Sequence, residues 1–227
     1  MNPVMQVIST SVEIIPPPAG IAKRAPHPRS VCVTDIADQI RACTLCRDRF
    51  AQTATAHAPN PVVWFRPGAR ILIASQAPGL KVHRANTPFW DASGKRLRSW
   101  LGMDDDTFYD RDRVAIVPMA FCFPGYDDRG SDLPPPPVCA KTWRREALDT
   151  LPDVALTVVI GAYAMRWHLG RVASVTAAVE QRTGRNRQIF ALPHPSWRNT
   201  GWLRKNPWFE QDVVPDLQRT VREVLHD

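Results

Sequence analysis

The chain has 227 residues, of which 44% are hydrophobic, and its formal net charge is +7. This length and apolar content favour one packed domain. No apolar run reaches the 18 residues of a membrane helix, and the N-terminus lacks a secretory pattern, so we expect a cytoplasmic protein without a membrane partner. The basic balance favours nucleic acid as a partner, and a basic protein without such a partner is the alternative.

The N-terminal segment differs in composition from the rest of the chain. Residues 1–30 are rich in proline and have no periodic apolar pattern, which predicts a disordered tail. Residues 31–227 are predicted to form the domain. A short helix is expected at its start, because Ile36, Ile40 and Cys43 share one helical face. A loop is expected from there to the first strand.

Two buried strands and one helix are predicted in the next part. The apolar runs 70–74 and 114–117 have the composition of strands buried on both faces. The first ends in a turn over 75–79, and the second stops at Pro118. The segment 94–101 is predicted to be helical.

Helices and strands continue to alternate in the C-terminal half. The elements expected in order are a Pro- and Gly-rich loop over 123–137, a helix through Trp143 and Leu148, a strand over 156–160, a helix through Met165 and Leu169, a strand over 188–192 and a C-terminal helix. Asn206 is the expected cap of that last helix, with Pro207 at its first position. Pro215 is expected to kink or divide it.

This alternation predicts a three-layer α/β/α sandwich with a mostly parallel central sheet. In such folds, functional sites form beyond the carboxyl ends of the strands. Three strand ends carry conspicuous sequences, at 75–79, 118–122 and 193–196. We expect these segments to converge at one edge of the sheet.

The cysteines are a second candidate site. The chain has five, and in a reducing cytosol metal ligation explains them better than disulfides. Four thiolates could bind a [4Fe–4S] cluster or one tetrahedral zinc ion, or they could be unconnected buried thiols, and their spacing does not choose between these. The four candidate ligands are Cys43, Cys46, Cys122 and Cys139, whereas Cys32 matches no ligand position.

An ordered set of short motifs resembles the uracil-DNA glycosylase superfamily. These motifs are Gln76-Ala77-Pro78-Gly79 after an apolar strand, then Pro88-Phe89, and later His194-Pro195-Ser196 at another strand end. With the order of its cysteines, the chain is most similar to the family 4 branch, whose members carry an iron–sulfur cluster. The resemblance covers roughly residues 35–226 and implies a [4Fe–4S] cluster that pins the N-terminal helix to the Pro-rich loop, with zinc as the alternative.

The resemblance also implies a chemistry, namely hydrolysis of the bond between a deaminated base and its sugar in DNA. His194 would donate a hydrogen bond to the departing base, and a structural histidine is the alternative. Phe89 would stack on the flipped base, unless it is a core residue. The turn formed by Ala77, Pro78 and Gly79 would bring backbone close to the base, and a simple strand-to-helix turn is the alternative.

Two positions depart from the family's first motif. Ser75 replaces its first glycine, and Gln76 replaces its acidic residue and cannot act as a general base. Asp91 lies near the place where a related branch, family 5, carries a catalytic aspartate after its Pro-Phe. The resemblance therefore implies Asp91 as the carboxylate that steadies the sugar cation and orients water, and a helix cap is its alternative role. The family's asparagine on the middle strand is also missing, so a backbone amide, Asn86 or Gln76 is expected to recognise the base edge.

The segment after His194 interleaves basic and aromatic residues, which suits a DNA backbone and a wedge that fills the gap left by the flipped base. Trp197 and Leu203 are the wedge candidates, and an exposed basic loop is the alternative. The predicted DNA-binding residues are Ser196, Trp197, Arg198, Asn199, Leu203, Arg204 and Lys205.

We therefore expect a monomeric, monofunctional uracil-DNA glycosylase that acts on single- or double-stranded DNA. No well-placed lysine argues for a lyase. A catalytically silent DNA-binding protein on the same fold is the first alternative, and a zinc-stabilised enzyme of other chemistry is the second.

Overall fold

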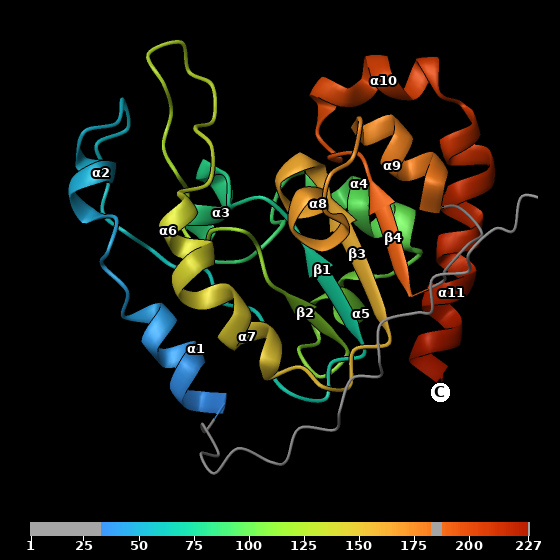
Figure 1. Cartoon of the computed structure of the whole chain (residues 1–227), viewed down its shortest axis with the longest axis horizontal. Coiled ribbons are helices and arrows are strands. Elements are labelled where there is room, and N and C mark those ends of the chain that lie inside the picture. Colours follow the sequence, from blue (N-terminus) through green and yellow to red (C-terminus); the bar gives the residue numbers. More distant parts are fainter. Residues whose placement is uncertain (1–32, 183–187, 227) are drawn as a thin grey trace, which may run out of the picture. The chain divides into compact units, whose positions relative to one another are not determined.

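The computed structural model describes residues 33–182 and 188–226. The predicted tail over residues 1–30 and Cys32 lie outside this part of the chain. The described residues form a parallel four-stranded sheet with helices on both faces (Figure 1). The strands are β1 (Ile71–Ala74), β2 (Val114–Ile116), β3 (Leu156–Ile160) and β4 (Ile189–Leu192). This arrangement confirms the predicted three-layer α/β/α sandwich.

The strand order in the sheet is β2-β1-β3-β4, and every pairing is parallel. Because all four strands are covered on both faces, their sequences are nearly continuous apolar runs rather than alternating ones. That composition is why each strand could be located from the sequence to within about one or two residues.

Each face of the sheet is covered by its own helices. On one face lie α1 (Val33–Arg41) and α7 (Arg145–Asp149), with Ile40 and Ala147 packed near Leu72 of β1. On the other lie α4 (Ala92–Leu101), α5 (Asp105–Tyr109) and α11 (Val214–His226), with Leu97 and Leu217 in the main core. Figure 1 shows α7 in front of the sheet and α4 and α5 behind it.

The remaining helices cover the sheet ends and the loops. Against β3 and β4 pack α8 (Gly161–Leu169) and α9 (Val175–Arg182). Residues 137–149 form one helical stretch of α6 (Pro137–Cys139), a π-helical turn η1 (Ala140–Arg144) and α7. The other short helices are α2 (Arg47–Ala51), α3 (Leu80–Ala85), η2 (Trp197–Asn199) and α10 (Thr200–Lys205).

The start of the C-terminal helix differs from expectation. The side-chain Nδ2 of Asn206 donates to the carbonyl oxygen of Trp202 at 2.8 Å, and Asn206 therefore closes α10 instead of capping the next helix. A π-helical turn η3 (Phe209–Val213) then runs without interruption into α11, which begins at Val214. Pro215 therefore does not divide the helix: it lies where π-helical hydrogen bonding gives way to α-helical, and proline has no N–H for the ladder there.

No helix within residues 33–182 and 188–226 is long and apolar enough to cross a membrane.

Candidate active site

The loops that follow β1 and β2 are joined by backbone hydrogen bonds. The N–H of Met119 donates to the carbonyl of Ser75 at 2.9 Å, and that of Ala120 donates to Gln76 at 3.0 Å. Parallel pairing therefore continues past the ends of both strands. This brings the segments 75–79 and 118–122 to the same edge of the sheet.

Gln76 lies against the start of α8 at the end of β3. Gly161 has a left-handed φ of +80°, and a Cβ atom there would lie 2.9 Å from Oε1 of Gln76. Glycine is required at this position for both reasons, because the φ and the space exclude a side chain. The carboxamide of Gln76 is only partly buried and has no hydrogen-bond partner among the described residues. Both its donor and its acceptor are therefore available to a ligand.

His194 follows β4 and is held in one tautomer. Its Nδ1 accepts the backbone N–H of Ser196 at 3.2 Å, so the neutral ring carries its proton on Nε2. Burial lowers the pKa of His194, the charges of Asp91 and Asp132 raise it, and Arg198 lowers it. The imidazole is therefore neutral at pH 7, and its Nε2–H is a hydrogen-bond donor.

Asn199 supports the same loop. Its Nδ2 donates to the carbonyl oxygen of His194 at 2.7 Å, which ties the histidine backbone to the start of α10. The amide end of Asn199 is thus occupied inside the protein, although the sequence predicts a DNA contact for this residue. The sequence contains no signal for that positioning role.

Asp91 is the N-cap of α4. Its Oδ1 accepts the backbone N–H of Gly94 at 2.9 Å, so the capping alternative is what the structure shows. The cap occupies one carboxylate oxygen. Because the charge of Asp91 raises the pKa of His194, the two side chains lie within electrostatic reach of each other.

Phe89 is held in a strained backbone conformation. Its φ is +54°, which is rare for a residue with a bulky side chain. Its carbonyl oxygen accepts hydrogen bonds from the Tyr109 hydroxyl at 3.3 Å and from Nη1 of Arg98 at 3.4 Å. A Cβ atom on Gly94 would lie 1.7 Å from that oxygen. Such strain is often found at ligand-binding positions. The Phe89 ring is partly buried and meets Phe108 edge-on at 6.0 Å.

Helix α4 is linked directly to the histidine loop. Nη1 of Arg96 donates to the carbonyl oxygen of Ser196 at 3.0 Å, although 100 residues separate them. This contact brings the segment around Phe89 and Asp91 together with His194. Two pockets formed elsewhere in the described residues, one polar and one lined by cysteines, do not include Gln76, Phe89 or His194. A shared pocket for a pyrimidine therefore stays a prediction.

The turn after β1 has ordinary backbone geometry. Gly79 has a φ of −85° and serves as the N-cap of α3, so its conformation does not require glycine. A Cβ atom on Gly79 would meet nothing within 4 Å. Ala77 and Pro78 are also partly exposed. The turn is thus open to a ligand, which is the property that the predicted role needs.

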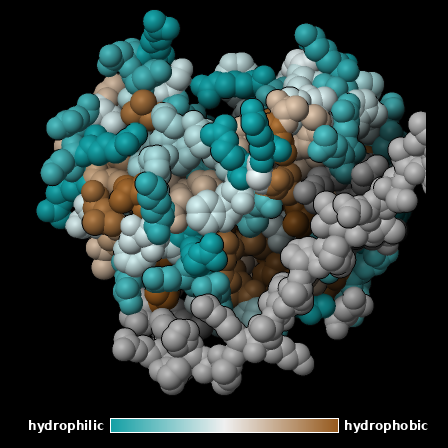
Figure 2. Space-filling model, viewed as in Figure 1, coloured by the Kyte–Doolittle hydropathy of each residue, from teal (hydrophilic) through white to brown (hydrophobic). Residues whose placement is uncertain are grey.

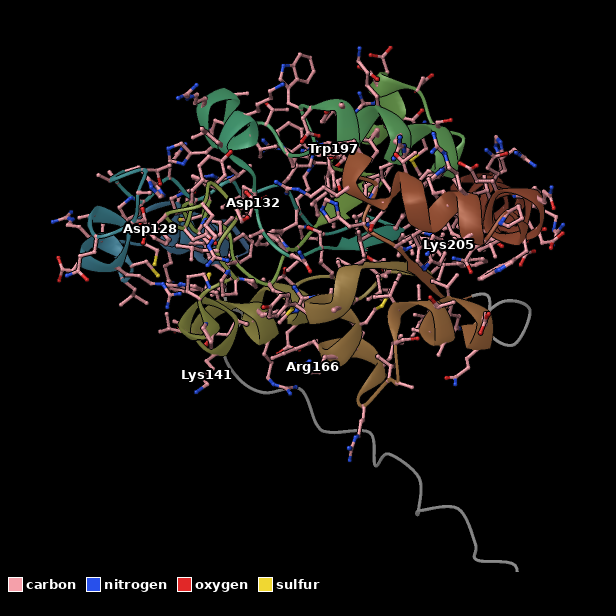
Figure 3. The ribbon with its side chains drawn as sticks, turned by 90° about the horizontal axis from the view of Figure 1, so that it is seen from above. Asp128, Asp132, Lys141, Arg166, Trp197 and Lys205 are labelled. Atoms are coloured by element: carbon pink, nitrogen blue, oxygen red, sulfur yellow. The ribbon has the colours of Figure 1, made fainter. Side chains whose placement is uncertain are left out.

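The predicted DNA-binding segment is helical, formed by η2 and α10. Trp197 is 75% exposed, whereas Leu203 is partly buried and packs against the main core, so Trp197 is the wedge candidate that projects outward. Arg198 pairs with Asp132 at 3.2 Å, and Arg204 and Lys205 are exposed at the end of α10. Figure 3 shows Asp132 and Trp197 on neighbouring segments, while Lys141 and Arg166 project from the opposite layer.

Asn86 lies in a separate polar pocket. It ends α3 with a left-handed φ of +50° and is exposed. The pocket has a volume of about 200 Å³ and is lined by Arg41, Asn60, Pro61, Val63, Asn86 and Arg111. The predicted role of Asn86 at the base edge therefore has no support from its position.

The four candidate metal ligands line one apolar pocket, with Ile40, Phe121 and Trp143 among its walls. Burial, with a smaller contribution from the charges of the other cysteines, raises the pKa of Cys122 to about 12 and that of Cys139 to about 11. Leu45 and Val138 are exposed at the rim. Figure 2 shows a hydrophobic patch near α2 and α6, on this side of the molecule.

Two buried donors beside this pocket have no partner in the described part of the chain. They are Nε1 of Trp143, which lines the pocket, and Nε of Arg144. Buried N–H groups are rarely left unpaired, so a missing acceptor is the simplest explanation. Within the same residues, no three His, Cys, Asp or Glu side chains are grouped closely enough to hold a metal ion.

Arg144 connects the cysteine pocket to the sheet edge. It is fully buried and donates through Nη1 to the carbonyl oxygens of Val117 and Pro118, at 2.6 and 2.8 Å. Burial lowers its pKa to about 10, and the nearby Cys139 raises it. A buried cation without a carboxylate is costly, so an anionic group at the cysteines would stabilise it. Sequence reasoning missed Arg144, since nothing local distinguishes it from a surface arginine.

Residues 62–218, more than half of the chain, match the family model described as the uracil DNA glycosylase superfamily. The match includes the segments at the sheet edge, the η2–α10 segment and two of the four candidate ligands. The segments are 75–79, 118–122 and 193–196, and the ligands are Cys122 and Cys139.

Proposed function

The chain belongs to the uracil DNA glycosylase superfamily, and from this premise we propose that it is a monofunctional DNA-repair glycosylase. It hydrolyses the bond between uracil and its deoxyribose in DNA and leaves an abasic site. The observation that carries this proposal is His194, which is partly buried, neutral and held with its Nε2–H as a donor at the edge where the motif segments meet.

The bond that breaks joins the base nitrogen to the sugar carbon, and the electron pair leaves with the base. Uracil then carries negative charge on an oxygen, and a donor aimed at that oxygen stabilises the charge. A neutral imidazole can do this without giving up its proton. In addition, a donor fixed in advance needs no reorganisation during the reaction. The Ser196 N–H supplies that fixation.

The other site residues position the base and the water. Phe89 stacks on the flipped base, and the free carboxamide of Gln76 recognises its polar edge, since uracil offers one acceptor and one donor side by side there. The second oxygen of Asp91 steadies the sugar cation and orients the attacking water. Trp197 fills the gap that the flipped base leaves in the strand.

We further propose that the four cysteines bind a [4Fe–4S] cluster with a structural role. The support is a pocket lined by four sulfurs, with unpaired donors at Trp143 and Arg144 that suit an anionic, sulfur-rich group. The resemblance to the family 4 branch favours a cluster over one zinc ion. The absorbance near 400 nm and the iron and zinc content of the purified protein test this. Cys32→Ser is the control and should leave the absorbance and the metal content unchanged, because that thiol matches no ligand position.

The function is tested with uracil, hypoxanthine or xanthine placed once in labelled single- and double-stranded oligonucleotides. After incubation, alkali cleaves any abasic site, and a gel separates the products. We expect a break at uracil with intact, metal-loaded protein. If no base is released while the DNA is still bound, the chain is a silent DNA-binding protein. The replacement of an acidic residue by Gln76 is the observation that favours this second candidate.

A further inference from the structure

The polar pocket beside β2 contains two arginines and no carboxylate. Its walls are formed by α1, by the segment 60–63 that runs beside β2, by the end of α3 and by the loop before β2. Arg41 and Arg111 supply the charge, and Asn60 and Asn86 are the other polar residues. The pocket is distinct from the sheet edge that holds His194.

Arg111 has no ion pair within the residues that the structure describes. Its neighbour Arg66 pairs with Asp112 at 2.6 Å, and Arg41 pairs with the exposed Asp38 at 2.6 Å. Burial lowers the pKa of Arg111, and the charges of Arg41 and Arg66 lower it further. A partly buried guanidinium next to other cations is unfavourable alone, and an anion between Arg41 and Arg111 would remove that cost.

An aromatic row leads from this pocket to the base site. The guanidinium of Arg111 lies 4.0 Å from the ring centroid of Trp64, which meets Tyr109 edge-on at 5.6 Å. Tyr109 lies 5.9 Å from the ring of Trp90 and donates its hydroxyl to Phe89. Trp90 is 56% exposed. Single-stranded nucleic acid is typically bound by cationic groups that contact its phosphates together with aromatic rings that stack on its bases.

The distance between the two sites suits neighbouring positions on one strand. Two residues lie between Asn86 and Phe89, so the chain that joins them spans at most about 10 Å. Phosphates of one DNA strand recur about every 3.4 Å along a duplex axis and lie farther apart in an extended single strand, so this reach covers at most about three nucleotides. Guanidinium groups match phosphate oxygens in geometry as well as in charge.

We propose that Arg41, Arg111, Asn60 and Asn86 form a phosphate-binding pocket that holds the DNA backbone within about three nucleotides of the flipped base. Trp90 stacks on an unpaired base between the two sites. The pocket therefore favours single-stranded or locally opened DNA. This inference rests on the proposed function for the identity of the ligand.

The test uses DNA binding instead of excision, so that its failure is separate from failure of the glycosylase proposal. A fluorescein-labelled single strand with a central abasic analogue gives the dissociation constant by anisotropy at several salt concentrations. We expect Arg111→Gln and Arg41→Gln each to weaken binding and to flatten the slope of log K against log salt by roughly 0.7, the value for one phosphate contact. Arg113→Gln is the matched control, because Arg113 is 54% exposed and already pairs with Asp110.

A second measurement locates the phosphate. Single uncharged methylphosphonate linkages are placed at each position on both sides of the abasic analogue. Wild-type binding should fall at one linkage within about three nucleotides, and Arg111→Gln should be insensitive there. If the Arg111→Gln variant unfolds, the Arg41→Gln variant still tests the proposal, because Arg41 lies on the exposed end of α1.

Unchanged salt slopes in both variants would overturn the proposal. It would also be overturned if inorganic phosphate raised the melting temperature of wild type but not of the variants, while DNA binding stayed equal. That result would assign the pocket to a small free anion. Uracil release by the same proteins is measured separately and tests only the glycosylase.

Discussion

The Nδ1 atom of His194 accepts the backbone N–H of Ser196, two residues further along the chain. Because this hydrogen bond occupies Nδ1, the neutral ring carries its proton on Nε2. The hydrogen bond also makes a charged imidazole unfavourable, because protonated Nδ1 would confront another donor. The chemistry proposed for the site follows from this arrangement.

We expect His194→Ala to lower the rate of uracil release about 100- to 1,000-fold, the usual loss when one oxyanion donor is removed. Binding of abasic DNA should change little, since the side chain acts on the departing base. Single-turnover kinetics and anisotropy measure the two separately. Because burial lowers the pKa of His194, wild-type activity should hold at pH 7 and fall in acid. An equally active mutant would remove His194 from the mechanism.

The role of Asp91 as a helix cap can be tested separately from the role of its negative charge. Asn accepts the Gly94 N–H as Asp does, so Asp91→Asn should keep the melting temperature within about 1 °C, whereas Asp91→Ala loses about 1 kcal/mol and 2–4 °C. If the carboxylate stabilises the sugar cation, both variants should lose at least about tenfold in uracil release. Full activity in Asp91→Asn would leave Asp91 with the structural role alone.

Gly94→Ala tests whether the strained backbone of Phe89 matters. The new methyl group would overlap the Phe89 carbonyl oxygen, so the segment must move, at a cost of about 1–3 kcal/mol in unfolding free energy. Base stacking should be lost with it, which lowers uracil release more than DNA binding. Gly201→Ala is the matched control for stability, since a methyl group there would meet no atom within 4 Å and alanine favours a helix.

The buried pair of Arg144 and His168 predicts a pH-dependent stability. Nη2 of Arg144 donates to Nε2 of His168 at 2.6 Å, and burial, then the charge of Arg144, lowers the pKa of His168 to about 4. The unfolded chain binds this proton more readily, so stability is fully present above about pH 6.5 and is lost as the pH falls towards 4. Urea unfolding between pH 8 and 4 measures it, and His168→Gln should flatten the dependence. His226→Gln, on the exposed helix end, should not.

Trp197 is the residue to test for the wedge. Removing one stacked aromatic side chain costs about 1–3 kcal/mol, so Trp197→Ala should weaken DNA binding by roughly 5- to 150-fold. Trp197→Phe should retain most of the affinity. Trp167→Ala serves as the control, because Trp167 is 41% exposed on α8, next to Arg166 in the opposite layer. Equal losses in both alanine variants would place the DNA elsewhere.

Much of the fold could be predicted because the strands are buried on both faces. Ile71–Ala74 and Leu156–Ile160 are unbroken apolar runs with turn residues after them, and such runs have few other stable placements. The short helices could not be predicted. For example, α3 follows Gly79 without a side-chain cap, and contacts with the rest of the molecule stabilise it.

The candidate site could be predicted in part for the same reason. Strand ends in a parallel sheet must share an edge, so Gln76 and His194 could be expected near each other. The second role of Asp91 as a cap and the hydrogen bond from Asn199 to the His194 carbonyl were decided by backbone geometry. Asn86 is one of three candidates for the base edge in the sequence, whereas the turn that ends α3 places it in the arginine pocket.

By itself, the sequence determined the layers of the fold, the order of the motifs and the residue types available for chemistry, since apolar periodicity and local turn chemistry act over short stretches of chain. Tertiary structure alone decided the hydrogen bond from Arg96 to the Ser196 carbonyl, the burial of Arg144 and the meeting of Arg41 with Arg111. Those properties depend on atoms far apart in sequence, whose charges, donors and acceptors interact only after the chain has folded around them.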